Sequence, residues 1–533
     1  VVCTTHTPVP AGIDIVGREL VHAQLGPYLE HMGVKKRIFD FGSMDGKNLN
    51  MAIMALRLSG ATNGVSRLHG IVSRRMWKDV FPGFEEHEVP IGHVTNGVHP
   101  CTWMSAPMQE LTRARFGETW FKDCSPENSD LIGKISSLPL EELWEVRNKL
   151  RSRLVDFINE RVVGRDYGAR YPMKKDVLTI GFARRFAPYK RANLILSDPE
   201  RLLGILGAEG RPVQFVFAGK SHPKDRAGKE LIHRLVAFAR RPEVRGRMVF
   251  IEDYDMEVAK QMVSGVDVWL NNPRVPFEAS GTSGMKAVMN GGLHLSTKDG
   301  WWAEEDGYPG WTINGPASYD GVEESVQDRL EAERLYEILE HELVPAFYDR
   351  PDGKLPLGWM ETVRASLSRL MPYFNTGRMV REYVESYYWP AREAHRLVRS
   401  GNGKAAVEYA AWLKQLRDAW KGIEIISLDA GAAGEVVLGE ALPVRLTLRS
   451  AELSPEHLGV ELVSGPITDD GMEVDSFHPL ELAECSEQGV CVYSADLVLS
   501  KSGDLGLGVR LTPRHPLLKV PARLGLIRTT VME

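Results

Sequence analysis

Short apolar runs alternate with amphipathic segments through the first two thirds of the chain. Several of these runs, rich in Val and Phe, occupy residues 176–182, 213–220, 247–254 and 266–273. They are apolar along most of their length, which is typical of strands buried on both faces of a parallel sheet. The opening VVCTTH predicts a similar strand, which Pro8 and Pro10 end.

Helical periodicity marks the segments between these strands. Residues 20–32 predict a helix that Gly26-Pro27 interrupts, and residues 51–58 and 72–77 predict two more. Residues 112–171 predict a charged helical hairpin. Acidic and basic residues recur there four positions apart, so we expect a solvated face.

The pattern changes after residue 421. Apolar and polar residues then alternate with a period of two, and turn residues separate the runs. This pattern predicts a small antiparallel β-sandwich. A packing role is favoured for it, and carbohydrate binding is the alternative.

A chain of 533 residues predicts three or four domains. We expect residues 1–165 to form the C-terminal part of a first Rossmann-like lobe and residues 166–372 a second lobe. Crossover helices would follow over 373–420, and the β-sandwich over 421–533. The chain opens inside a strand, with neither an initiator Met nor a signal peptide, as in a chain cut within a domain.

The charge and the cysteine content of the chain bear on its partners and on its cellular compartment. The net charge is −6, and no apolar run reaches the length of a membrane span, so neither a nucleic-acid nor a membrane partner is expected. The five cysteines form no CxxC pair or zinc spacing. We therefore expect free thiols in a reducing cytoplasm and no metal site, although Cys485 and Cys491 could bridge a hairpin.

The strongest candidate for chemistry is residues 278–286, EASGTSGMK. Its glycines let the backbone present N–H groups to an anion, and a helix-like run follows. Lys286 lies among Met285, Ala287 and Val288, which predicts a half-buried amine. Burial lowers a lysine pKa, and a neutral amine can condense with an aldehyde. Pyridoxal phosphate or another phosphorylated ligand would fit, and the alternative is a Gly/Ser-rich turn with an outward-extending lysine.

A second cluster follows the predicted strand at 176–182. Arg184, Arg185 and Lys190 lie just beyond its end, where ligands collect in α/β sheets. Three converging cations favour a bound anion, and the alternative is an exposed basic loop. His6 and Asn96 also lie in loops of this kind, where a lone histidine is more often structural.

Five motifs in order resemble those of the α-glucan (glycogen, starch, maltodextrin) phosphorylases. They are THTPVPAG at 5–12, NGVSRLHG at 63–70, TNGVH at 95–99, GFARRFAPYKR at 181–191 and EASGTSGMK at 278–286. The chain is most similar to the long bacterial branch, and the likeness runs to about residue 391. It implies the two-lobed GT-B fold, with about the first third of a full-length member missing here.

The resemblance also implies roles for single residues. Lys286 would carry pyridoxal phosphate, Arg184, Thr282 and Ser283 would hold its phosphate, and Tyr254 and Trp103 would lie beside it. Arg185 and Lys190 would bind inorganic phosphate. The glucose unit would meet His6, Asn96, Glu278, Ser280 and Gly281. His69 and Trp77 are expected to be packing residues.

The implied reaction is phosphorolysis of the terminal α-1,4 glucosyl bond to glucose 1-phosphate with retention. The cofactor phosphate would relay a proton, because its second pKa lies near neutrality. Two departures from the family pattern are Ile13, where the bacterial branch has His, and Asp255, where animal enzymes have a basic residue.

Two alternatives stay open. A nucleotide-sugar glucosyltransferase of the glycogen-synthase type shares the fold, and a truncated, non-catalytic glucan-binding homologue would share the motifs. If residues 1–533 were the whole polypeptide, we would expect an unstable first lobe and little activity. Family members are usually homodimers, so a homodimer is expected.

Overall fold

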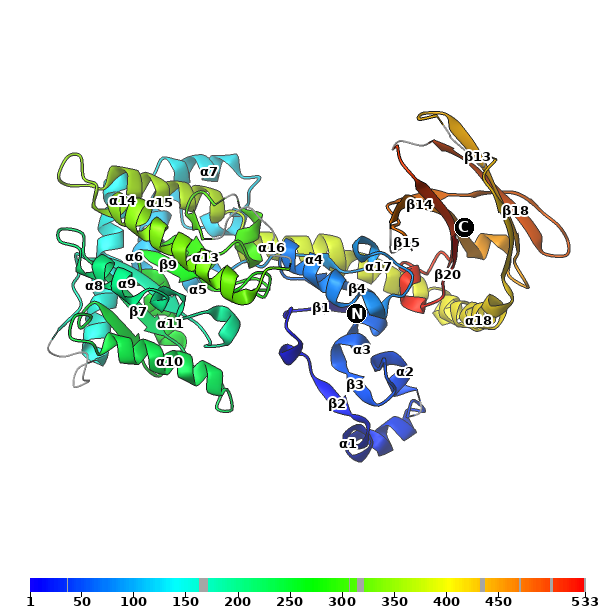
Figure 1. The fold of residues 1–533 in the computed structure, drawn as a ribbon, viewed down its shortest axis with the longest axis horizontal. Helices are drawn as coiled ribbons and strands as arrows, with labels where there is room; N and C mark the ends of the chain where they lie inside the picture. The colour runs from blue at the N-terminus through cyan, green and yellow to red at the C-terminus, as the bar shows by residue number, and fades with distance from the viewer. Residues whose placement is uncertain are drawn as a thin grey trace.

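The largest structured part of the chain is built on a six-stranded parallel sheet. The computed structural model describes residues 1–35, 37–162, 171–305, 307–313, 321–431, 437–468, 471–498 and 502–531. Figure 1 shows this sheet and its helices at one end of an elongated molecule and a group of antiparallel strands at the other. The predicted boundary at 165/166 lies outside the described residues, and the division into four segments stays a prediction.

The order of the strands identifies where a ligand site is expected. The strands are β6 (Leu178–Ala183), β7 (Val213–Ala218), β8 (Met248–Ile251), β9 (Val268–Asn271), β10 (Leu293–Ser296) and β11 (Trp311–Thr312). They run in the order β11-β10-β9-β6-β7-β8, and all are parallel. The chain therefore builds outwards from β6 and then outwards from β9 on the other side. The crevice between these two strands is the topological switch point, where α/β sheets bind ligands.

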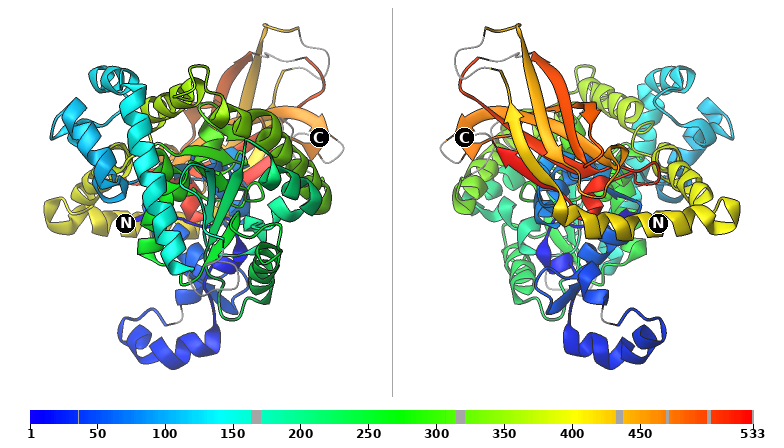
Figure 2. Two further views of the ribbon diagram at one scale, coloured as in Figure 1. Left: turned by 90° about the vertical axis from the view of Figure 1, so that its left-hand side faces the viewer. Right: turned by 90° about the vertical axis from the view of Figure 1, so that its right-hand side faces the viewer.

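Helices connect these strands and cover both faces of the sheet. They are α9 (Pro199–Gly207), α10 (Arg226–Ala239), α11 (Met256–Gly265) and α12 (Thr282–Val288). The long helix α8 (Leu140–Arg161) runs along one face, as the left view of Figure 2 shows, and buries Leu154, Val155 and Ile158 against it. The other face shares one core with α9, α10, α13 (Glu324–Glu337) and α15 (Leu357–Leu370), and α7 (Ser129–Ser136) packs on α15. The predicted α/β unit is thus confirmed.

Helix α8 has the expected solvated charged face, on which Glu145, Lys149 and Arg153 are exposed, but two of its arginines are exceptions. Arg147 and Arg151 are buried, and both contact the buried carboxylate of Asp267, Arg151 at 2.7 Å and Arg147 at 3.5 Å. Arg147 also donates to the carbonyls of Ser264 at 2.7 Å and Asn290 at 2.8 Å. Burial is possible because the acid and the carbonyls satisfy the guanidinium groups.

The N-terminal part forms a smaller parallel sheet. Strands β1 (Val2–Thr4), β4 (Ala61–Gly64) and β5 (Gly92–His93) make it up, with α4 (Arg67–Met76) beside it. Helix α3 covers Met51–Leu58, as predicted. His69 and Trp77 are buried, so their prediction as packing residues is confirmed.

Helix α1 (Arg18–His31) is not interrupted at Gly26-Pro27, contrary to the prediction. Pro27 lies inside the helix and removes one backbone hydrogen bond. Val21 and Leu29, on either side of it, are buried against Phe39 and Leu49. We infer that this packing offsets the cost of the proline.

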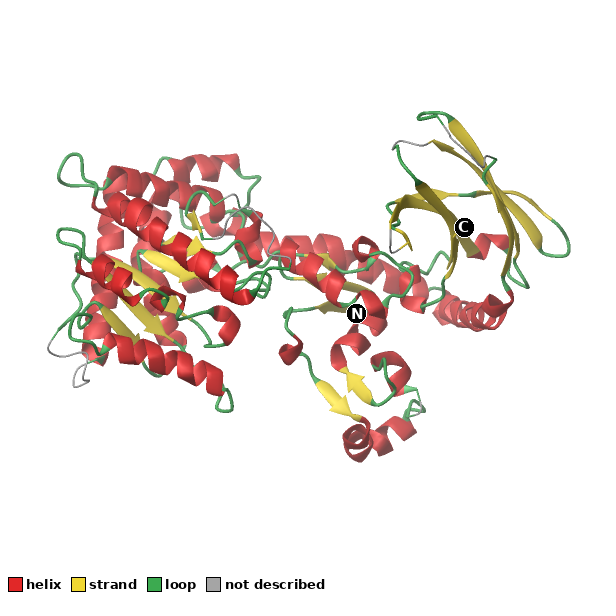
Figure 3. Ribbon diagram, viewed as in Figure 1, coloured by secondary structure: helices red, strands yellow, loops and turns green. Residues whose placement is uncertain are grey.

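A run of helices links the two ends of the molecule. Helix α16 (Thr376–Tyr383) continues through a π-helical turn into α17 (Trp389–Val398), and α18 (Lys404–Ala419) follows. Figure 3 shows this helical run between the parallel sheet and the C-terminal strands. The predicted helical segment is confirmed.

The C-terminal strands form two antiparallel sheets around one core. The first has the order β12-β13-β18-β17, with bounds Glu424–Asp429, Ala441–Arg449, Val490–Val498 and Glu481–Cys485. The second has the order β15-β14-β19-β20, with bounds Gly471–Met472, Leu458–Thr468, Leu505–Pro513 and Arg528–Val531, and β16 (Ser476–Pro479) pairs with β14. Leu446, Leu462 and Leu511 from both sheets share the core. The predicted antiparallel strands are confirmed.

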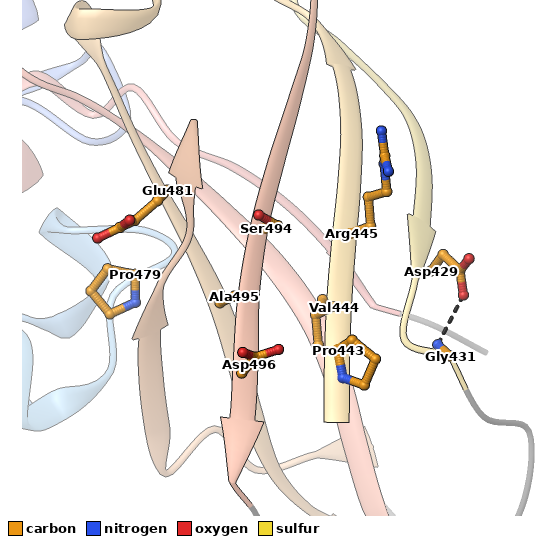
Figure 4. Close-up of a pocket in the computed structure, with 10 residues that line it drawn as sticks. All are labelled: Asp429, Gly431, Pro443, Val444, Arg445, Pro479, Glu481, Ser494, Ala495 and Asp496. Carbon is orange, nitrogen blue, oxygen red and sulfur yellow. Dashed lines mark hydrogen bonds between the residues drawn. The ribbon is translucent and has the colours of Figure 1, made fainter. Parts of the chain in front are cut away.

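A pocket of about 690 Å³ lies on the first of these sheets, and Figure 4 shows the side chains that line it. Arg445, Glu481 and Asp496 are among them, and no aromatic residue is present among its described lining residues. Ligand pockets are usually lined by apolar and aromatic side chains. The choice between a packing role and carbohydrate binding for the C-terminal sheets stays a prediction.

The cysteine prediction is corrected at one pair. Cys485 and Cys491 form a disulfide across the neighbouring strands β17 and β18 rather than two free thiols. Adjacent pairing of these strands places the two residues opposite each other, which their spacing alone does not require. Cys3, Cys101 and Cys124 are free.

A search of the helices found none with the length and apolar character needed to cross a membrane, within the ranges given above.

Candidate active site

The sequence motif at 278–286 forms the loop after β9 and the first turn of α12. Gly281 precedes the helix with φ of +78°, a left-handed conformation that glycine adopts without strain. Gly284 faces the ring of the buried His294, where a Cβ would lie 2.4 Å from a ring carbon. The two glycines are thus required by backbone conformation and by close packing, respectively.

Lys286 lies on this helix against an aromatic ring. Its Nζ is 3.6 Å from the centroid of the Trp103 ring. Burial lowers the pKa of the Lys286 amine. Met285, Ala287 and Val288 around it are buried, as the sequence pattern predicted.

A buried side-chain amide joins the two backbone segments that carry Trp103 and Lys286. Asn290 Nδ2 donates to the carbonyls of Trp103 at 2.8 Å and Lys286 at 2.9 Å, and its Oδ1 accepts from the Ser105 N–H at 2.7 Å. Asn290 therefore holds the Trp103 segment against α12. Sequence reasoning missed this residue, which lies two positions beyond the end of α12.

Two of the predicted cations converge on Glu278. Lys190 Nζ lies 2.9 Å from Oε1 and 2.7 Å from Oε2 of Glu278, and Arg184 Nη2 donates to the same carboxylate. Arg184 and Lys190 follow β6 and Glu278 follows β9, so the cluster lies at the topological switch point. All three side chains are at most one tenth exposed.

Burial and neighbouring charges set the ionisation of this cluster. Burial, and then the Arg184 charge, lower the pKa of Lys190 to about 8. Burial acts to raise the pKa of Glu278, but Arg184 and Lys190 together outweigh it and hold the pKa below its usual value. The cluster has two cations for one anion, which leaves a surplus positive charge for an anionic ligand.

Arg185 interacts electrostatically with Lys190 of this cluster, and Tyr254 with Arg184. Arg185 is exposed. Burial, and then the Glu278 charge, raise the pKa of Tyr189, and the charge and hydrogen bond of Arg185 oppose this shift. Burial raises the pKa of Tyr254, and the Arg184 charge opposes the shift, which places Tyr254 near Arg184. Thr282 is half-buried, and Ser283 Oγ accepts from the Trp269 indole at 3.2 Å.

Two polar groups at the site have no acceptor or donor among the described residues. Arg184 Nη1 and Ser280 Oγ are buried without a hydrogen-bond partner in that part of the chain. A buried guanidinium N–H is costly unless an acceptor satisfies it. Both groups fit a site that binds a phosphate oxygen and a sugar hydroxyl.

His6 and Asn96 lie on the N-terminal part of the chain, after β1 and β5. His6 is exposed after β1, and its electrostatic interaction with His69 contributes to the lowered pKa of that ring, after burial as the main cause. Asn96 is half-buried, and its carbonyl accepts from Arg378 Nη2 at 3.1 Å. Across the described ranges, no hydrogen bond joins either side chain to Glu278 or Lys286.

Hydrogen bonds of side chains nevertheless connect the N-terminal loops to the motif and to the segment after β10. Ser66 Oγ, at the start of α4, donates to the Ala279 carbonyl at 2.8 Å. Glu304 accepts from the Arg67 N–H at 2.9 Å and from Thr95 Oγ1 at 2.6 Å. These residues were not predicted, since the contacts join positions more than 200 apart in the sequence.

Asp299 is another residue that the sequence analysis missed. It is buried after β10, and its Oδ2 accepts from the Glu278 N–H at 2.9 Å. The signal was available, because Asp299 closely follows an apolar run at the edge of the sheet where ligands bind. No group of three or more metal-ligating side chains was found in the residues described.

Comparisons with known proteins now identify the family. A family model described as carbohydrate phosphorylase matches residues 26–305, which is more than half of the chain. The chain belongs to the carbohydrate phosphorylase family. A second model, for the glycogen phosphorylase C-terminal domain, matches residues 420–531. The C-terminal strands are therefore part of the family likeness, which corrects the expectation that it ends near residue 391.

Several curated relatives match over almost the whole chain. The glycogen phosphorylase of Mycobacterium tuberculosis (strain ATCC 25618 / H37Rv) is 40% identical over 99% of this chain and 63% of its own length. The maltodextrin phosphorylase of Thermococcus litoralis is 36% identical over 98% of this chain and 62% of its own length. The chain thus spans about 63% of the length of these phosphorylase relatives.

Proposed function

We propose that the polypeptide containing this chain is an α-1,4-glucan phosphorylase, which transfers terminal glucosyl units to inorganic phosphate with retention. The observation that carries the proposal is the convergence of Arg184 and Lys190 on Glu278, just ahead of the helix that holds Lys286 against Trp103. Membership of the family supports it. So do the names of relatives, two of which are a glycogen and a maltodextrin phosphorylase.

The residues present fit pyridoxal phosphate. Lys286 would attach it, since the amine is half-buried with a lowered pKa, and Trp103 and Tyr254 would flank it. The partnerless Arg184 Nη1 and the N–H groups of Thr282 and Ser283 are the donors for its phosphate. When bound, the cofactor supplies a phosphate whose second pKa is near neutrality, suited to proton exchange.

The chain's own residues bind and orient the substrates. Lys190 and the exposed Arg185 would hold inorganic phosphate, because cations offset the repulsion between phosphate groups. Glu278, Ser280 and Gly281 would bind the hydroxyls of the terminal glucose. His6 and Asn96 would reach the same glucose from the N-terminal sheet, across the two lobes of a GT-B fold. The buried carboxylate of Glu278 would also favour positive charge developing on the sugar.

The experiment is an assay of the natural polypeptide with glycogen and with maltodextrin. We expect glucose 1-phosphate to form only when inorganic phosphate and pyridoxal phosphate are both supplied. The rival glucosyltransferase would instead transfer glucose from a nucleotide sugar and would not need the aldehyde cofactor. Transfer from UDP-glucose without phosphorolysis would overturn the proposal, and absence of both activities with retained glucan binding would favour a non-catalytic homologue.

A pH dependence follows from Lys190. Its pKa is lowered to about 8, so the amine loses its proton as the pH rises through that value and no longer attracts phosphate. We expect the KM for phosphate to increase between pH 7.5 and 9.5. The Lys190→Arg variant should show a flatter profile, because arginine stays protonated throughout this range. Equal pH profiles for the two proteins would contradict this role of Lys190.

A homodimer and a cytoplasmic location stay predictions.

A further inference from the structure

A buried turn after β10 grips the loop that carries Glu278. Asp299 Oδ2 accepts from the Glu278 N–H at 2.9 Å, and the Trp301 N–H donates to the Ser280 carbonyl at 2.9 Å. Asp299 is 1% exposed and Trp301 is fully buried. Two hydrogen bonds thus fix the backbone of residues 278–280 from behind.

The turn lies so close to this loop that a side chain at position 300 would clash with the loop. Gly300 has φ of +55°, and a Cβ there would lie 2.4 Å from the Ser280 carbonyl oxygen. Trp301 packs in turn against the rings of Phe374 and His294, at centroid distances of 4.5 and 5.0 Å. The turn is therefore held by the core, and the loop takes its position from the turn.

We propose that Asp299 is a positioning residue that sets the place of Glu278 and Ser280 against the terminal glucose. This inference rests on the proposed function, in which those two residues contact the sugar. A hydrogen bond to a backbone N–H leaves the Glu278 side chain free to face Lys190, Arg184 and the substrate. Asp299 acts on the reaction through the loop and does not itself contact the sugar.

The carboxyl group of Asp299 is suited to this task because both of its oxygens accept hydrogen bonds. Burial raises its pKa to about 8, and the hydrogen bond from the Glu278 N–H opposes that shift. Oδ1 accepts from the Gly300 N–H at 2.8 Å while Oδ2 accepts from the Glu278 N–H. An asparagine offers only one acceptor oxygen, and its NH2 group would face the second N–H. Alanine offers neither. Aspartate, asparagine and alanine at position 299 should therefore hold the loop with two, one and no hydrogen bonds, respectively.

The test uses the natural polypeptide with Asp299→Asn and Asp299→Ala. We expect kcat/KM for glucan to fall about tenfold for asparagine, the loss of roughly one hydrogen bond, and further for alanine. The absorbance of the lysine-bound cofactor should stay as in the wild type. Asp198→Asn is the matched control, since Asp198 caps α9 through the Arg201 N–H at 3.0 Å and lies outside the proposed site. It should keep wild-type kcat/KM.

A double-mutant cycle separates positioning from general stability. If Asp299 acts through Glu278, Asp299→Asn should cost much less in a Glu278→Gln background than in the wild type. The same fold loss in both backgrounds would overturn the proposal. So would wild-type kcat/KM in Asp299→Ala.

Amide hydrogen exchange tests how firmly the loop is held and does not need an activity assay. Exchange in the peptide covering residues 277–284 should be at least about tenfold faster in Asp299→Ala, whereas peptides from α9 should be unchanged. Unchanged exchange at 277–284 would overturn the inference. If exchange at 277–284 is faster in Asp299→Ala as expected but the wild-type polypeptide shows no phosphorolysis, the proposed function is overturned and the effect of Asp299 on the loop is not.

Discussion

Replacing Lys286 by alanine is expected to lower the rate of glucan phosphorolysis by roughly a thousandfold or more, the scale set by removing a group that the transition state requires. The amine is half-buried beside Trp103 and has a lowered pKa, as attachment of an aldehyde cofactor needs. Under the proposed function, pyridoxal phosphate would then have no covalent anchor. The measurements are glucose 1-phosphate release and the absorbance of the lysine-bound cofactor, and both should be lost together.

Two further variants show whether the amine chemistry or only the charge matters. Lys286→Arg keeps a cation over the Trp103 ring but cannot condense with an aldehyde, so it should be as inactive as Lys286→Ala. Lys260→Ala removes an exposed lysine from α11 and should retain wild-type activity. Substantial activity in Lys286→Arg would show that the residue does not anchor the cofactor.

Replacing Asp267 by alanine is expected to destabilise the protein by about 3–5 kcal/mol, the usual cost of removing one partner from a buried ion pair. Asp267 is the carboxylate between Arg147 and Arg151, and all three side chains are at most 2% exposed. Its Oδ2 also accepts from the Thr179 N–H at 3.0 Å. Burial lowers the pKa of Arg147 to about 10, and the Asp267 charge opposes that shift. The variant leaves two buried guanidinium groups without their anion.

The measurement is unfolding by denaturant, compared with Asp156→Ala. Asp156 pairs with Lys175 at 2.7 Å, but both side chains are about half exposed. Solvent screens such a pair, so its loss should cost only about 0–1 kcal/mol. Equal stability losses in the two variants would show that solvent screens the ion pairs of Asp267 as well.

Local sequence was enough to predict much of the site. The apolar runs predicted the parallel strands, and the residues around Lys286 predicted its partial burial. The cations after β6 were predicted to converge, which Arg184 and Lys190 do. Their direct contact with Glu278 was not predicted, because the ion pairs join residues 88 and 94 positions apart.

Other features depended on partners that no local pattern reveals. The spacing of charges on α8 is the same for a solvated and a buried arginine, and only the position of Asp267 decides between them. The continuation of α1 through Pro27 depends on the packing around Phe39. Pairing of Cys485 with Cys491 depends on the register of β17 against β18.

By itself, the sequence determined the parallel strands, the glycine-rich turn and the half-buried amine, because hydrophobic period and backbone conformation are properties of neighbouring residues. The tertiary structure alone decided which charges meet. It set Glu278 between two cations, Asp299 behind Glu278, and Asp267 between two arginines. These contacts arise because parallel strands end at one edge of the sheet and helices pack across it, which brings distant residues together at low dielectric, where each charge must find a partner.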